Sequence, residues 1–167
     1  MPSAVSNSSP LIHLAAIGSF ALLRDFFEEI RLPPAVWREV VEEGRGRPGA
    51  EEVEQAAERG WLRVVALRDA ALATSLKRTL DDGEAEAIAL AVQEKADCVL
   101  LDESDARKAA EVQGLTKTGV IGLLIRAKRQ GRIASLRERL SCLRDEAGFW
   151  IDDSLYQAAL QAARESP

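Results

Sequence analysis

The segment from residue 81 to residue 119 reads DDGEAEAIALAVQEKADCVLLDESDARKAAEVQGLTKTG, and it contains the pattern that decides the fold. It begins with acids that can cap a helix, and the stretch 85–92 is apolar on nearly all sides, as in a buried helix. The apolar run CVLL at 98–101 is typical of a strand covered on both faces. Asp102 ends that run, at the end of a strand where open α/β sheets place their sites. We therefore expect carboxylates from a helix start and a strand end to converge, with Asp105 and Arg107 close behind them.

Short apolar runs and helical patterns alternate on either side of this segment. Further strands are expected at 4–6, 30–32, 61–67 and 115–118, the third of them at a sheet edge, and helices at 10–17, 20–29, 35–43, 50–59, 69–80, 105–113, 120–130, 135–146 and 152–164. This alternation predicts a three-layer α/β/α sandwich with a central, mostly parallel sheet. We expect one domain, residues 1–167, with basic and amphipathic C-terminal helices (about 120–165) packed on it.

The composition argues against several classes of protein. Cys98 and Cys142 form neither a disulfide framework nor a zinc spacing, which favours a reducing, cytoplasmic location. No apolar stretch approaches the roughly 18–20 residues of a membrane span, and no signal-peptide pattern opens the sequence, so we expect no membrane contact. His13 is the single histidine and lies in an apolar helical pattern, where a structural role is favoured and Ser-His-Asp catalysis is not.

Charge is distributed unevenly along the chain. Residues 117–144 include eight basic residues and one acid, Glu138, a local charge of +7, whereas the whole chain carries −5 and the remainder therefore −12. This asymmetry suits a polyanion held beside a metal-binding carboxylate cluster, while a solvated helical face is the simpler interpretation of charge alone. Aromatic residues are missing from the basic segment, which favours phosphate contact over base stacking there. The candidates for nucleic-acid binding are Arg107, Lys117, Arg126, Lys128, Arg129 and Arg132.

Four residues with oxygen side chains are the candidates for a metal site: Asn7 after the first strand, Glu39 on a helix, Glu84 at a helix start and Asp102 at a strand end. Mg²⁺ and Mn²⁺ take oxygen ligands and keep several waters, so a few clustered carboxylates with room for a phosphate suffice. A bound metal lowers the pKa of its water, so hydrolysis needs no histidine. Acids at helix starts also complement the helix dipole, and this interpretation stays open for Glu84 and for two further candidates, Glu86 and Asp105.

Six phrases resemble, in order and over nearly the whole chain, the PIN-domain-like family of predicted nucleic-acid-binding proteins, relatives of the VapC toxin nucleases: VSNSSPLIHLAAIG, LPPAVWREV, DDGEAEAIALA, LLDESDARKAA, TGVIGLLIRAKRQGRI and GFWIDDSLYQAAL. The resemblance implies an α/β/α sandwich with a metal-dependent ribonuclease site at the carboxyl ends of its strands. It also implies that the four candidates take the family's four acidic positions. Asn7 departs from the usual aspartate, because its amide oxygen can bind a metal or hold a water but brings no charge, so metal affinity is expected to fall.

The leading hypothesis is a Mg²⁺- or Mn²⁺-dependent PIN-like endoribonuclease, with the toxin of a toxin–antitoxin pair as one form of it. Its catalytic residues would be Glu39, Glu84 and Asp102, with Asn7 as a further metal ligand. Ser8 or Ser9 would orient a water or a phosphate. The expected partners are RNA, an antitoxin protein and a second copy of the chain in a homodimer.

Two alternatives from other classes stay open. The first is a binding module that holds nucleic acid or a partner without cutting, because Asn7 weakens the site. The second is a receiver-like regulatory domain, since acids at strand ends of parallel sheets also bind Mg²⁺, although Asp102 and Lys117 fit that pattern only loosely.

Overall fold

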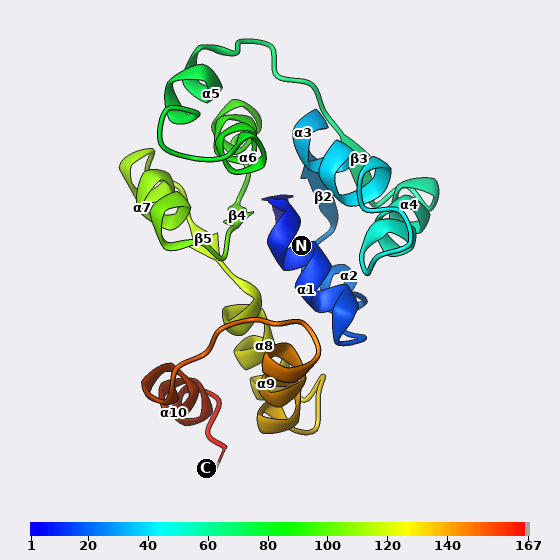
Figure 1. The fold of residues 1–167 in the computed structure, drawn as a ribbon, viewed down its shortest axis with the longest axis vertical. Helices are drawn as coiled ribbons and strands as arrows, with labels where there is room; N and C mark the ends of the chain where they lie inside the picture. The colour runs from blue at the N-terminus through cyan, green and yellow to red at the C-terminus, as the bar shows by residue number, and fades with distance from the viewer. Residues whose placement is uncertain (166–167) are drawn as a thin grey trace.

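The structure is a computed structural model that describes residues 1–165. Strands and helices alternate along the chain, and Figure 1 shows helices on both sides of a central sheet. In chain order the elements are β1 (Ser3–Ser6), α1 (Ser8–Ala16), α2 (Leu22–Phe26), β2 (Glu29–Leu32), α3 (Pro34–Trp37), the π-helical turn η1 (Arg38–Glu42), α4 (Ala50–Glu58), β3 (Leu62–Val64), α5 (Ala71–Leu76), α6 (Asp82–Glu94), β4 (Cys98–Leu100), α7 (Ser104–Val112), β5 (Lys117–Thr118), α8 (Val120–Arg129), α9 (Leu136–Asp145) and α10 (Asp153–Ala162).

Within residues 1–165 the sheet has five strands, all parallel, in the order β3-β2-β1-β4-β5. The order reverses next to β1, because the chain leaves β1 for β2 on one side and returns to β4 on the other. Val5 in the centre pairs with Arg31 of β2 and with Val99 of β4. The carboxyl ends of β1 and β4 therefore border the switch point at which open parallel sheets bind ligands. Asn7 lies at this point, and its backbone N–H donates to the carbonyl of Leu100 at 3.0 Å.

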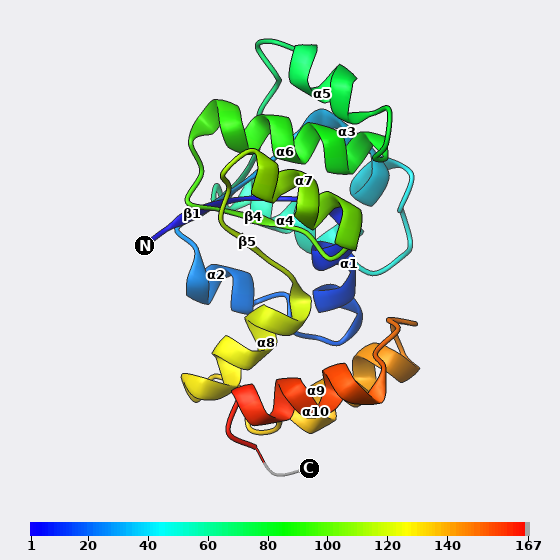
Figure 2. The same cartoon turned by 90° about the vertical axis from the view of Figure 1, so that its left-hand side faces the viewer.

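Alternate residues of the central strands pack into two separate layers. Ala4 and Leu100 belong to the cluster under α1, α2 and α8, whereas Val5, Val99 and Leu101 belong to the cluster under α6 and α7. Figure 2 shows α6 and α7 on one face of the sheet and α2 and α8 on the other. This division explains why CVLL is apolar throughout: a strand between two helical layers needs apolar residues on both faces. The fold class predicted from the sequence is confirmed.

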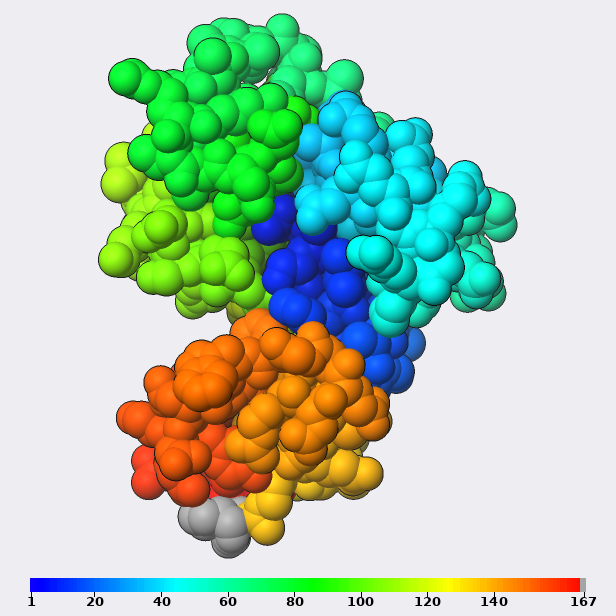
Figure 3. Space-filling model, viewed as in Figure 1, coloured from blue at the N-terminus to red at the C-terminus, as the bar shows by residue number. Residues whose placement is uncertain are grey.

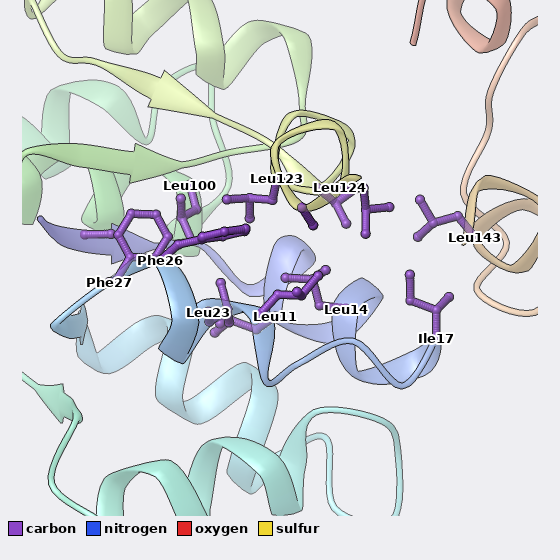
Figure 4. Packing of buried hydrophobic residues seen from close by; sticks show 14 of the residues in the cluster. Leu11, Leu14, Ile17, Leu23, Phe26, Phe27, Leu100, Leu123, Leu124 and Leu143 are labelled. Carbon is purple, nitrogen blue, oxygen red and sulfur yellow. The ribbon is translucent and has the colours of Figure 1, made fainter. Parts of the chain in front are cut away.

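The larger cluster joins the sheet to the C-terminal helices. Figure 4 shows Leu11 and Leu14 of α1 packing near Leu123 and Leu124 of α8, with Leu143 of α9 beyond them. Burying each such leucine contributes about 1.5–3 kcal/mol. In Figure 3 the yellow-to-red segment of α8–α10 forms a lobe against the blue N-terminal segment.

A polar contact also fixes this lobe to the first helix. Arg139 of α9 donates through Nη1 to the carbonyl of Ile17 and to Oγ of Ser19, both at 3.0 Å. The C-terminal helices are thus anchored to the end of α1, which begins beside the switch point. No helix within residues 1–165 combines the length and the apolar character that crossing a membrane requires.

Several predicted boundaries were wrong for reasons of tertiary structure. The helix expected at 20–29 is only Leu22–Phe26, because Phe27 is extended (φ −129°, ψ 136°) and Glu29 pairs with Ser3 in the sheet. The helix expected at 69–80 is shortened to Ala71–Leu76 and the strand expected at 61–67 to Leu62–Val64, which does form the predicted edge.

The helix expected at 35–43 widens in its second half. Glu43 N–H donates to the carbonyl of Arg38, five residues back, at 2.8 Å, which is the hydrogen bond of a π-helix. Such turns are frequent at functional sites, and Glu39 lies within this one.

Candidate functional site

The turn that leaves β1 connects two candidate carboxylates. Ser8 Oγ donates to Glu39 Oε2 at 2.8 Å, and Ser9 Oγ donates to Asp102 Oδ2 at 2.9 Å. Consecutive serines thus hold one carboxylate from η1 and one from the end of β4 on either side of the turn. The role expected from the sequence for Ser8 or Ser9, to orient a water or a phosphate, stays a prediction; in the structure each serine is hydrogen-bonded to a candidate ligand.

Asn7 presents an unpaired oxygen to the same region. The residue is 4% exposed, and its Oδ1 has no hydrogen-bond partner within residues 1–165. A Cβ added to Gly83, in the first turn of α6, would lie 2.9 Å from Asn7 Oδ1 and 3.3 Å from Glu39 Oε2. Both oxygens therefore face the same point, and the close approach of α6 requires glycine there. An unsatisfied buried acceptor costs about 1–3 kcal/mol, so this oxygen suits a water or a cation.

Asp102 is the most extensively bonded of the candidates. Its side chain is 4% exposed, Oδ1 accepts the backbone N–H of Val120 at 2.8 Å, and Oδ2 lies 3.2 Å from Nδ1 of His13 in addition to the bond from Ser9. The N–H of Val120 opens α8, so the helix dipole also favours the negative charge. The site therefore holds the Asp102 carboxyl in one position.

His13 lies in the site, although its place in an apolar helical pattern favoured a structural role. Its ring contacts Asp102 through Nδ1 and meets the ring of Phe149 edge to face, with 4.9 Å between centroids. Ser9 Oγ lies 3.3 Å from the same Nδ1. The signal that could have found it is the spacing of Ser9 and His13, four residues apart and hence on one face of α1.

Glu84 has a different environment at the start of α6. It forms a capping box with Asp81: Glu84 N–H donates to Asp81 Oδ1 at 2.8 Å, and Asp81 N–H donates to Glu84 Oε1 at 3.1 Å. Burial raises the pKa of Glu84 to about 7, and the nearby charge of Asp81 adds to this effect. The carboxyl lines a hollow of about 330 Å³ together with Asp81, Glu103 and Asp105. No hydrogen bond within residues 1–165 joins it to Asn7, Glu39 or Asp102.

Glu86 has structural contacts of its own. Its carboxylate accepts a hydrogen bond from the N–H of Ala35 at 3.2 Å and pairs with Lys77 Nζ at 3.1 Å. It therefore links α6 to the start of α3 and to the end of α5. Asp105 shares the hollow of Glu84.

Glu39 and Asp102 line separate cavities. One, of about 440 Å³, is lined by Glu39 and Gly83 together with Arg38, Glu43, Asp81, Asp82 and Ala35. The other, of about 350 Å³, is lined by Asp102 together with Arg107, Lys117, Thr118, Gly119, Ile121, Gly122, Phe149 and Leu155. In Figure 3 the blue start of the chain is visible between the green and cyan segments, with an orange part of the C-terminal segment below it.

The basic candidates separate into two groups. Arg107 and Lys117 line the cavity of Asp102. The others lie at or beyond the last turn of α8, about 10–15 Å along the helix from its start beside Asp102. There Arg126 covers the ring of Phe26 at 4.3 Å, Lys128 donates to the carbonyl of Ala134, and Arg132 lies 4.0 Å from Asp25, while Arg129 is exposed. Their role in nucleic-acid binding stays a prediction.

The donor atoms present suit a hard cation more than a soft one. Asn7, Glu39, Glu84 and Asp102 offer only oxygen, whereas burial raises the pKa of the Cys98 thiol to about 11. Within residues 1–165 no three side chains of histidine, cysteine, aspartate or glutamate converge closely enough to hold a metal ion. Magnesium is commonly bound by one or two carboxylates with waters and substrate phosphate, and the unpaired oxygen of Asn7 beside Glu39 fits that mode.

Comparisons with known proteins are consistent with this geometry. The model of a protein family described as PIN domain matches residues 3–165 of this chain. Among solved structures, a PilT N-terminus domain protein from the hyperthermophilic archaeon Sulfolobus solfataricus P2 is similar to this chain, with a TM-score of 0.55 and 18% sequence identity. The match covers 72% of this chain and 89% of that protein's chain. At that identity the likeness concerns the fold. No curated protein matches the sequence.

Proposed function

Since this chain belongs to the PIN domain family, a family with a nuclease-like fold, we propose that it is a metal-dependent endoribonuclease. The observation that carries the proposal is the arrangement at the carboxyl edge of the sheet. Asn7 Oδ1 and Glu39 Oε2 face one point beside Gly83, and Asp102 is held across the same turn by Ser9. Oxygen donors at a switch point, where open parallel sheets bind ligands, suit metal-assisted hydrolysis of a phosphodiester.

PIN domains generally use divalent metal ions, and in this chain Asn7, Glu39, Glu84 and Asp102 would hold Mg²⁺ or Mn²⁺. The ion, when bound, supplies an activated water and neutralises charge on the phosphodiester. Ser8 and Ser9 fix the orientation of Glu39 and Asp102.

Glu84 would act as one of these ligands from the start of α6. Burial raises the pKa of its carboxyl to about 7 without a metal, and a bound cation would favour the ionised form that coordinates it. Its capping box with Asp81 keeps the carboxyl at the start of α6, three residues from the helix N-cap.

RNA is the proposed substrate because the cavity beside Asp102 also contains cationic groups. Arg107 and Lys117 line it, and phosphate oxygens pair well with guanidinium and ammonium groups. The basic residues at the end of α8 would contact the strand further along. The same proposal includes a toxin role with an antitoxin partner. It also includes a homodimer, which sedimentation of the purified chain would detect.

The test is cleavage of a labelled single-stranded RNA with Mn²⁺, with Mg²⁺ and with EDTA. We expect metal-dependent cleavage by the wild type and a loss of at least about 100-fold in Asp102→Asn, comparable to removal of one electrostatic group in an active site. The matched control is Asp145→Asn, since that side chain is 72% exposed and pairs only with Arg144 within residues 1–165. Equal cleavage by wild type and Asp102→Asn would refute the proposal. Salt-sensitive binding without turnover would favour the binding module instead.

A further inference from the structure

We propose that the cavity beside Asp102 is a binding site for one nucleobase of the RNA strand, with the ring of Phe149 as its stacking surface. The inference rests on the proposed function, because it identifies the part of the substrate that this cavity takes. Its walls join two kinds of chemistry. Phe149, Ile121 and Leu155 are apolar, whereas Asp102 and the cationic groups are polar.

The size of the cavity suits one nucleotide unit. Its volume of about 350 Å³ lies at the lower end of the roughly 300–1,000 Å³ of small-ligand sites. Gly119 and Gly122 form part of its lining at the start of α8, and the wall is closely packed there: a Cβ on Gly119 would lie 2.7 Å from Asp102 Oδ1 and a Cβ on Gly122 2.6 Å from Thr118 Oγ1, so larger residues at these positions would displace the wall. A planar base has room there between α8 and α10.

Phe149 is held in place before any ligand arrives. Its backbone N–H donates to the carbonyl of Leu143 at 2.9 Å, and its ring packs against the main core and meets His13 edge to face. The next residue but one, Ile151, is buried in the same core. A ring that is already ordered loses little conformational freedom on binding, so stacking on it keeps most of its favourable free energy.

The charged groups indicate where the phosphate would lie. Arg107 Nη1 donates to the carbonyl of Leu101 at 3.1 Å, and within residues 1–165 its guanidinium makes no ion pair. Lys117, in contrast, is paired with Glu111 at 2.5 Å. Arg107 is thus the cation ready for a phosphate beside Asp102, and the apolar wall of Phe149 takes the attached base. A base in this cavity cannot be paired in a duplex, so the strand is unpaired at this position.

The nucleotide is favoured over a protein partner by charge and by continuity with the carboxylate edge. An exposed aromatic that would suit a protein partner does exist nearby, since Trp150 is 83% exposed. It is adjacent to Phe149 in sequence but does not line the cavity. Trp150 therefore supplies the control that separates the two kinds of partner.

The experiment measures fluorescence anisotropy of two labelled oligonucleotides of about eight nucleotides, one of uridines and one of abasic units, in EDTA so that neither is cut. Wild type should prefer the uridine strand by about 5- to 100-fold, the range expected for stacking of one base. Phe149→Leu should bring the two affinities to within about twofold, while Phe149→Tyr should retain the preference. Leu155→Trp, at a residue 42% exposed, should also reduce it by narrowing the cavity.

Trp150→Ala should retain the wild-type preference. The proposal is overturned if the wild type shows no preference for the uridine strand, if Phe149→Leu keeps that preference, or if Trp150→Ala abolishes it. Self-association that is lost only in Trp150→Ala would assign the surface around Trp150 to a protein partner. The proposed function fails independently. Base-dependent binding with no cleavage would contradict the nuclease, whereas metal-dependent cleavage with no base preference would contradict only the base site.

Discussion

Substitution of Asn7 by aspartate should make the protein less stable without metal and more stable with it. The substituted oxygen is buried, unpaired and faces the same point as Glu39 Oε2. In Asn7→Asp a second carboxylate would occupy this position. Without a cation the two negative charges repel each other, and a bound cation would be coordinated by both.

The magnitude follows from the geometry beside Gly83. The two oxygens lie 2.9 and 3.3 Å from one point, so they are at most about 6 Å apart. At an effective dielectric constant of about 20, two unit charges at that distance repel by about 3 kcal/mol. For a chain of this length each kcal/mol lowers the melting temperature by about 2–4 °C, so Asn7→Asp should melt about 6–12 °C below the wild type at pH 8 in EDTA.

The assay is thermal unfolding at pH 8 and pH 5, with EDTA and with Mn²⁺. The difference should shrink at pH 5, because the new carboxyl, whose pKa is raised by burial and by Glu39, can be protonated there. Mn²⁺ should stabilise Asn7→Asp more than the wild type. The control is Asn7→Ser, which keeps a neutral oxygen and should show no such dependence on pH. Equal melting temperatures for wild type and Asn7→Asp at pH 8 in EDTA would refute the placement of Asn7 beside Glu39.

Three further predictions concern the same edge of the sheet. The pKa of Glu84 is raised from 4.5 to about 7, so between these pH values the folded protein retains a proton that the unfolded chain has lost. The free energy of unfolding should therefore fall as pH rises from 4.5 to about 7. We expect a fall of about 2 kcal/mol, which is less than the full shift would give because solvent screens a partly exposed carboxyl. Urea denaturation should show this slope in the wild type and not in Glu84→Gln. Ser9→Ala removes the hydrogen bond to the Asp102 carboxylate and should cost about 1.5–3 kcal/mol in the same measurement, so a change below about 0.5 kcal/mol would contradict it. In Gly119→Ala the new Cβ would lie 2.7 Å from Asp102 Oδ1 and 3.0 Å from the carbonyl of Leu101, so we expect a loss of about 1–3 kcal/mol and displaced Asp102, and wild-type melting would contradict that.

The fold was predictable from local patterns that agree with the global arrangement. The continuous apolar run at 98–101 required a strand between two layers, and β4 lies in the centre of the sheet. The meeting of Asn7 with the end of β4 follows from parallel topology alone, since carboxyl ends share one edge. Predicted boundaries were wrong where a tertiary contact competes with local propensity. Glu29, for example, belongs to a helical sequence pattern but pairs with Ser3 in the sheet.

The details of the site depended on packing between distant segments. No local signal indicates that Gly83 must admit Asn7 and Glu39, because the three lie on separate elements. Phe149 approaches His13 only because the chain folds back after α9. The basic segment was interpreted from charge alone, whereas several of its side chains pair with neighbours in the structure, such as Lys128 with Glu165.

The most direct test of a metal site at this edge is titration calorimetry of Mn²⁺ into the wild type and into Asp102→Asn, with Asp145→Asn as the control. We expect binding by the wild type and by the control, and a loss of at least about tenfold in affinity for Asp102→Asn, in line with the removal of one group from a metal site. No binding by the wild type, or equal binding by all three proteins, would contradict a metal site at Asp102.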